Sequence, residues 1–204
     1  MMMSVEKNDW EKSIEFHGHS CPGLAIGYRV AQAALAELAA VRAIDEELVA
    51  IVENDACGVD AVQALTGCSL GKGNLIYRDH GKQVYTFVCR DSGRAARIAV
   101  KASAWRNHPG HKELRIKYFS GAASPEEREV FQQIQRERTE RILEMPAEEL
   151  YEVRQVEVEL PPLARVFDTL ICAECGEPVM EPRARLQEGK VVCLPCAGQY
   201  SRGW

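Results

Sequence analysis

The sequence predicts an α+β fold, in which an antiparallel or mixed sheet packs against helices and a small C-terminal domain is built on four cysteines. Three observations support this fold class. A segment rich in alanine and leucine follows Pro22, several short β-branched segments are bounded by turn residues, and two Cys-x-x-Cys pairs lie near the C-terminus. Because Pro161 and Pro162 stiffen the chain, we expect a core domain at 1–162 and a second domain at 163–204.

The composition is that of an ordinary globular protein. Of the 204 residues, 46% are hydrophobic and 27% are charged, and the net charge of −5 gives no bulk attraction to nucleic acid. The first residues contain no apolar run typical of a secretory signal, and charged side chains interrupt the most apolar stretch, 24–41. We therefore expect a cytoplasmic protein that does not enter a membrane and keeps its cysteines reduced.

The first half of the core is expected to alternate helices and strands. Pro22 suits the first turn of a helix, and the apolar residues after it predict a helix buried on most sides, in a core or against another protomer. The β-branched segment 47–55 predicts a strand. A short helix is expected from Cys57, closed by Gly67.

Four later segments predict further strands. The alternating segments 74–79 and 83–91 flank a short His-Gly-Lys sequence, which together predict a β-hairpin. We expect two more strands at 94–102 and 113–119.

A long helix is expected before the domain boundary. Ser124, Pro125 and Glu127 form a capping-box sequence that predicts its start, and Pro146 ends it. One side of this helix carries an apolar stripe and the rest is charged, which is typical of a helix with a solvated face. The alternating segment 153–162 then predicts a strand.

The C-terminal cysteines have the spacing of a structural zinc site. Two Cys-x-x-Cys pairs are separated by 17 residues, and two such turns complete a tetrahedron of thiolates with no open position. A hairpin with Glu188-Gly189 at its turn and a short helix after the second pair would give a treble-clef zinc finger, which is too small to fold without its metal. The predicted zinc ligands are Cys172, Cys175, Cys193 and Cys196.

We expect this finger to bind a partner protein. Five basic and five acidic residues balance between Arg165 and Trp204, which gives a weak footprint for nucleic acid. Arg183 and Arg185 share one face of a strand and leave nucleic acid open as an alternative.

Two histidines and a cysteine crowd the stretch FHGHSCPG, residues 16–23. His17, His19 and Cys21 are two residues apart, so in an extended segment their side chains point the same way. The stretch is open to three interpretations: a metal site, a catalytic thiol with nearby bases, or a loop leading into a helix. In each, Cys21 would be the helix N-cap, where backbone N–H groups and the helix dipole lower the pKa of a thiol.

A second cysteine, Cys57, opens the next helix in the same way. Asp60 lies one turn further and could orient a histidine or a metal-bound water, and Cys68 follows this helix near the expected site. If the pocket is an active site, Cys57 and Asp60 are the candidate catalytic residues. Mixed nitrogen and sulfur ligands suit zinc and allow iron, and the expected ligands are His17, His19, Cys21 and Cys57, with the choice between the two histidines open.

Three other features have structural interpretations. The Gly71-Lys72-Gly73 sequence lacks the frame of a phosphate-binding loop and predicts a tight turn. Cys89 lies within an expected strand and is interpreted as a small core residue. His108 and His111 flank a Pro-Gly turn and predict a loop, from which one histidine could reach the site.

The sequence FHGHSCPGLAIGYR, followed by NDACGVDAVQALTGCSLGKGNLIYRDHGK, resembles the FmdE family, which is named for a component of formylmethanofuran dehydrogenase, over about residues 10–160. Some members of this family carry an added C-terminal zinc finger. The resemblance implies an α+β core, a close homodimer, and a link to molybdenum- or tungsten-dependent formylmethanofuran dehydrogenase in methanogenic metabolism. It also implies a shared metal-binding pocket, because the family's motifs include His19, Cys21, Cys57, Asp60 and Cys68.

Three functions fit these features. The first is a dimeric metal-binding accessory protein whose finger binds a partner protein. The absence of a ferredoxin cysteine pattern and of a pterin-binding signature argues against the redox component itself. The second is an enzyme that acts on a small carbonyl or formyl compound through a metal or a thiol. The third is a transcriptional regulator that senses a ligand or metal and contacts nucleic acid through the finger.

Overall fold

The computed structural model describes residues 7–105 and 110–198. The chain forms two compact units, Met1–Leu163 and Ala164–Trp204. Each unit is described by itself below. No helix in the described part of the chain is long and apolar enough to cross a membrane.

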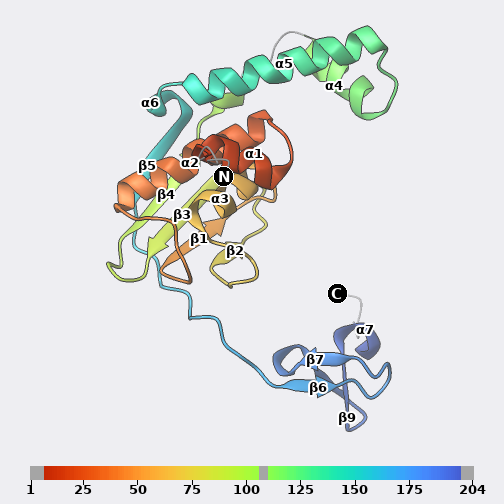
Figure 1. Ribbon diagram of the computed structural model, residues 1–204. Helices are drawn as coiled ribbons and strands as arrows, with labels where there is room; N and C mark the ends of the chain where they lie inside the picture. Colours follow the sequence, from red (N-terminus) through yellow and green to blue (C-terminus); the bar gives the residue numbers. More distant parts are fainter. Residues whose placement is uncertain (1–6, 106–109, 199–204) are drawn as a thin grey trace, which may run out of the picture. The chain divides into compact units, whose positions relative to one another are not determined.

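The larger unit is built on a five-stranded mixed sheet with the order β2-β1-β3-β4-β5 (Figure 1). β1 pairs parallel with β2, and the other neighbouring strands are antiparallel. This arrangement confirms the predicted α+β class. The strands are β1 (Leu48–Val52), β2 (Leu75–Tyr77), β3 (Val84–Cys89), β4 (Ala95–Val100) and β5 (Tyr151–Gln155).

Helices cover one face of this sheet. Tyr85 and Phe87 of β3 point to that face and are fully buried in the main core. Val88 points to the other face, where Val156 and Val158 of the segment after β5 pack against it. The helices are α1 (Asp9–His17), α2 (Pro22–Leu38), α3 (Gly58–Thr66), α4 (His111–Phe119), α5 (Pro125–Glu144) and α6 (Ala147–Leu150), with a 3-10 turn η1 (Ala102–Trp105).

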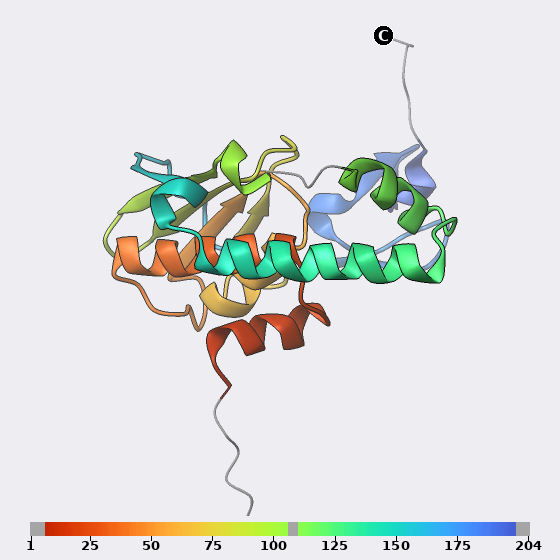
Figure 2. The same cartoon turned by 90° about the horizontal axis from the view of Figure 1, so that it is seen from above.

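α5 runs along α2, and its N-terminal part projects beyond the N-terminal end of α2 with α4 beside it (Figures 1 and 2). The expected capping box is present, with Ser124 and Glu127 bonded reciprocally at the start of α5. At the other end, the guanidinium of Arg29 in α2 donates to the carbonyl oxygens of Ile142, Leu143 and Met145 at 2.9, 2.6 and 2.9 Å. These bonds satisfy the last carbonyls of α5 and fix the helix on α2.

The predicted hairpin is wrong. β2 and β3 do not pair with each other but lie on opposite sides of β1, whose five residues are all buried. The connection between them crosses the end of β1, where Arg78 N–H donates to Val52 and Lys82 N–H donates to Glu53, both at 2.9 Å. Alternating polarity shows that a segment is a strand, but not which strand it pairs with.

The strand predicted at 113–119 is also wrong, because this segment belongs to α4. His111, Leu114 and Tyr118 are its less exposed residues, and their spacing places them on one face of a helix. That face packs on α5, where the rings of Tyr118 and Phe131 stack with centroids 4.2 Å apart. The strand predicted at 153–162 is shorter than expected, since β5 ends at Gln155.

The smaller unit contains two short hairpins and one helical turn. The predicted turn at Glu188-Gly189 is confirmed, with φ of 50° and 77° at the two residues. Its elements are β6 (Thr169–Ile171), β7 (Pro178–Met180), the 3-10 turn η2 (Glu181–Arg183), β8 (Arg185–Gln187), β9 (Lys190–Val192) and α7 (Leu194–Ala197).

Candidate metal and thiol site

Glycines bring the N-terminal ends of α2 and α3 together. A Cβ atom on Gly27 would lie only 2.0 Å from the carbonyl oxygen of Gly58, so only glycine permits this crossing. A Cβ atom on Gly23 would lie 3.7 Å from Sγ of Cys57 and 4.0 Å from Sγ of Cys21. The crossing therefore places the two cysteines that precede these helices side by side.

Cys21 is the N-cap of α2, and its Sγ accepts the N–H of Leu24 at 3.4 Å. The expected lowering of its pKa is wrong. Burial raises the pKa of Cys21 to about 11, and the neighbouring Cys57 thiol raises it further, against the smaller effect of the N–H groups of Leu24 and Gly23. Without a cation nearby, the Cys21 thiol therefore keeps its proton at neutral pH.

Cys57 does not repeat the design of Cys21. Its backbone is helical, with φ −47° and ψ −29°, and its side chain makes no capping hydrogen bond. The turn before α3 is held instead by Asn54, whose Oδ1 accepts the N–H of Ala56 at 3.1 Å. The Cys57 side chain is thus left for the site.

His17 lies between a carboxylate and a thiol. Its Nδ1 is 2.6 Å from Oδ2 of Asp60, and its Nε2 is 3.8 Å from Sγ of Cys21. With the carboxylate accepting the Nδ1 proton, the Nε2 lone pair faces Cys21, which is the orientation that metal-binding histidines adopt. The ring of His19 lies beside that of His17, with centroids 4.5 Å apart.

The extended backbone assumed for this stretch is wrong at His17, which ends α1. A capping box of Asn8 and Glu11 starts this helix and Gly18, with φ 95°, closes it. The donor atoms of His17, His19 and Cys21 nevertheless lie within 4.8 Å of one another. These three residues form the core site, with Cys57 beside Cys21 but outside this group.

Cys68 is not part of the core site. It follows the C-terminus of α3, about 13 Å of helix away from Cys57 at its N-terminus. Its buried thiol donates to the carbonyl of Leu48 at 3.2 Å, and burial raises its pKa to about 11. The family motif therefore contains one cysteine that packs in the core.

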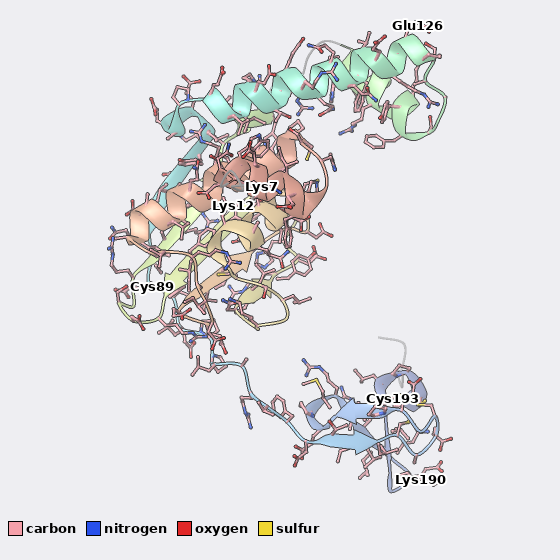
Figure 3. The ribbon with its side chains drawn as sticks, in the orientation of Figure 1. Lys7, Lys12, Cys89, Glu126, Lys190 and Cys193 are labelled. Carbon is pink, nitrogen blue, oxygen red and sulfur yellow. The ribbon has the colours of Figure 1, made fainter. Side chains whose placement is uncertain are left out.

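The remaining sequence features are structural where they are described. Lys72 donates from Nζ to the carbonyl oxygens of Ile44 and Asp45 at 3.1 and 3.0 Å, which ties down the predicted turn. Cys89 is half-buried at the end of β3 (Figure 3). His111 is buried between α4 and α5, with Nε2 3.1 Å from Nη1 of Arg138, while His108 lies outside the described residues.

Two cavities meet the core site, and Cys57 lines both. One has a volume of about 680 Å³ and extends from His19, Cys21 and Cys57 to α4 and α5. The other, of about 500 Å³, is lined by Cys57 together with His17, Asp60 and Asp55. The site is thus open to small molecules from two directions.

The four C-terminal cysteines converge as expected for zinc. Their thiols lie within 4.8 Å of one another, with Cys193 at the start of α7 (Figure 3). The N–H groups of Cys175 and Cys193 lower the pKa of Cys172 to about 6, which prepares a thiolate for a cation. Cys172, Val192 and Cys193 are the buried apolar residues of this unit's described part, so the metal would take the place of a core.

The fold and the two clusters define an α+β protein with a histidine–thiol site and an attached four-cysteine finger. The family described as FmdE, Molybdenum formylmethanofuran dehydrogenase operon, matches residues 16–152, and the prokaryotic dksA/traR C4-type zinc finger matches residues 167–202. The chain belongs to the FmdE family and carries a C-terminal zinc finger, which confirms the resemblance found in the sequence.

Two similar proteins extend this comparison. A protein of Archaeoglobus fulgidus, named a probable S-adenosyl-L-methionine-binding protein, is 35% identical over 193 residues, which cover 91% of this chain and 51% of the relative. The chain thus spans about half the length of that relative. An FmdE-like protein of tungsten formylmethanofuran dehydrogenase from Syntrophus aciditrophicus has the same fold, with a TM-score of 0.58, 24% identity, and coverage of 92% of this chain and 89% of that one.

Proposed function

We propose that this chain is a metal-binding accessory protein that works with formylmethanofuran dehydrogenase or a related enzyme. The convergence of His17, His19 and Cys21 within 4.8 Å carries the proposal. Asp60 fixes the ring of His17 from behind, which is the support that metal-binding histidines receive in other proteins. The link to the dehydrogenase rests on the family to which the chain belongs.

The donor set fits a borderline metal ion. Two imidazoles and a thiol suit zinc and allow ferrous iron, and Cys57 stands ready as a further ligand or as a contact to a bound molecule. A metal held here would supply a Lewis acid that faces the two cavities. All eight cysteines are free thiols, which suits the reducing cytoplasm that we propose as the location.

Two assembly steps complete the proposal. A second copy of the chain would cover Ile116 and Val130 of α4 and α5, which are 57% and 53% exposed. Sedimentation is then expected to give a dimer mass. The finger would bind a partner protein, because its basic and acidic residues balance. Titration with duplex DNA at low salt is accordingly expected to show no binding.

Metal analysis of the purified full chain tests the core site. We expect two metal ions per chain, of which His17→Asn or Cys21→Ser removes one and Cys172→Ser removes the other. Cys89→Ser is the matched control and is expected to keep both. A single metal ion in the wild type, abolished by Cys172→Ser, would show that the core holds none.

A thiol enzyme is the second candidate, favoured by the order Cys21, His17 and Asp60. Sγ to Nε2 is 3.8 Å and Nδ1 to Oδ2 is 2.6 Å, so the histidine could take the thiol proton while the carboxylate orients the ring. Alkylation by iodoacetamide tests this function. An activated thiol reacts faster than free N-acetylcysteine and slows in His17→Asn; equal or slower rates in the wild type exclude it.

A further inference from the structure

The larger cavity beside the core site has the size and shape of a small-molecule pocket. Its volume of about 680 Å³ falls in the range of known ligand sites. Its floor is formed by His19, Cys21 and Cys57, and its wall by α4 and α5. The projection of α4 and α5 past the N-terminal end of α2 places this wall over the cysteines (Figure 2).

Aromatic rings form one side of the wall. Tyr118 stacks on Phe131 at 4.2 Å between centroids, and Phe119 meets Phe131 edge-on at 5.9 Å. These contacts hold Phe119 in place although its side chain is 75% exposed. A fixed, exposed aromatic ring that lines a cavity offers a stacking surface for a planar ligand.

The charge of the wall is basic. Arg136 lines the cavity together with Gln132 and Gln135, and no carboxylate lines it among the described residues. The Nε and Nη2 atoms of Arg136 donate to Oε1 of Gln133 at 3.1 and 2.7 Å, which orients the guanidinium and leaves it further N–H donors. A carboxylate or phosphate is the group that such a guanidinium recognises.

The second cavity excludes the same ligand by its charge. It is lined by Asp55 and Asp60, which repel an anion, and it lacks the rings of α4 and α5. The two sides of Cys57 therefore differ in sign, and an anion is favoured on the α5 side alone.

We propose that the cavity between the core cysteines and α5 binds a small molecule combining a planar aromatic or heteroaromatic ring with a carboxylate or phosphate. The ring stacks on Phe119 and the anionic group pairs with Arg136, so that the rest of the molecule faces Cys21 and Cys57. This inference deepens the proposed function, since it names the ligand class of the proposed metal site. The recognising residues, however, are not the proposed metal ligands.

Ligand-observed NMR titration of the full chain with five probes tests the proposal. Benzoate or phenyl phosphate is expected to bind at least about fivefold more tightly than benzamide, which lacks the charge, and than cyclohexanecarboxylate, which lacks the ring. Benzylamine, a cation of similar shape, is expected to bind most weakly. The order of benzoate and phenyl phosphate tells which anionic group the pocket prefers. Equal affinities for benzoate and benzamide, or a preference for benzylamine, would overturn the proposal.

Variants separate the ring contact from the charge contact. Arg136→Gln is expected to abolish the preference for benzoate over benzamide, and Phe119→Ala to weaken both probes alike. Both side chains are exposed, so the fold is not at risk. Arg115→Gln removes the same charge from α4 outside the cavity and should change nothing. An Arg136→Gln protein that keeps the wild-type preference contradicts the assignment.

One further variant keeps the two proposals apart. His17→Asn removes a proposed metal ligand without altering a residue that lines this cavity. If the preference for ring and anion persists in this variant, or in a wild type found to hold no core metal, the pocket stands without the metal function. If the metal is bound and the preference is absent, the pocket proposal alone fails.

Discussion

The two cysteine-containing sites of this protein are built in opposite ways. The finger takes four thiols from two short turns, so each pair of ligands is fixed by its own local sequence. The core site takes its groups from the end of α1, the start of α2 and the start of α3, and depends on how these helices cross. The finger is closed around its thiols, whereas the core site opens into two cavities.

This difference shows what each metal would do. In the finger the metal replaces a hydrophobic core, since few apolar residues are buried there. In the larger unit the core is complete without a metal, because α2 and α3 pack on the sheet through fully buried apolar side chains. We therefore expect the finger's metal to determine folding and the core metal to determine ligand binding.

The largest effect is expected from disrupting the finger. Structural zinc contributes about 10–16 kcal/mol to folding in small fingers, so Cys172→Ser should unfold the segment 164–198. The measurement is amide dispersion in NMR spectra of the full chain. The resonances of the core should stay in place, and Cys89→Ser, which alters a cysteine outside both sites, should leave both units folded. A dispersed finger in the Cys172→Ser protein would contradict this division of roles.

The crossing of α2 and α3 is the corresponding weak point of the core site. Gly27→Ala would place a Cβ 2.0 Å from the carbonyl oxygen of Gly58. Overpacking of this kind costs about 1–3 kcal/mol and moves the helices apart. We expect a lower urea midpoint for the larger unit together with weaker core metal binding. Gly71→Ala, whose Cβ would meet no atom within 4 Å, is the control and should change neither.

A smaller and purely local effect is expected at Asp60. Asp60→Asn keeps the shape of the side chain but removes the charge that orients His17, and the loss of such a partner typically weakens metal binding about 10–100-fold. Competition with a chelator measures the affinity, and the urea midpoint should stay nearly constant. Asp55→Asn, which alters a carboxylate lining the same cavity, serves as the control. Unchanged metal affinity in Asp60→Asn would show that the carboxylate does not support a ligand.

The same contrast explains what the sequence could predict. The finger, α2 and α5 follow from local signals: two Cys-x-x-Cys pairs, Pro22 and the capping box at Ser124. α1 also has such signals in Asn8, Glu11 and Gly18, and these could have corrected the extended backbone assumed at His17.

Features that depend on distant parts of the chain could not be predicted in this way. The placement of β1 between β2 and β3 is one, and the contact of Gly27 with Gly58 is another. The pKa of Cys21 is a third, because the burial that raises it comes from packing of distant segments rather than from its position at a helix start.

The smallest effect distinguishes a third kind of cysteine, which binds nothing. Burial raises the pKa of Cys68 from 9.0 to about 11, so the folded state keeps this proton to higher pH than the unfolded chain. The resulting stability is present below pH 9 and is lost as the pH rises through 11; it amounts to about 2–3 kcal/mol.

Cys68→Ser tests this sign. Serine retains a donor for the carbonyl of Leu48 but does not ionise in this range. Both proteins share the contribution of buried Tyr85, whose pKa is raised to about 12, so the difference between their urea midpoints isolates Cys68. That difference should change between pH 9 and 11 by the loss expected for the wild type. Parallel curves would mean that Cys68 is solvated, and the core would then be open at the C-terminal end of α3 as well as at its N-terminal end.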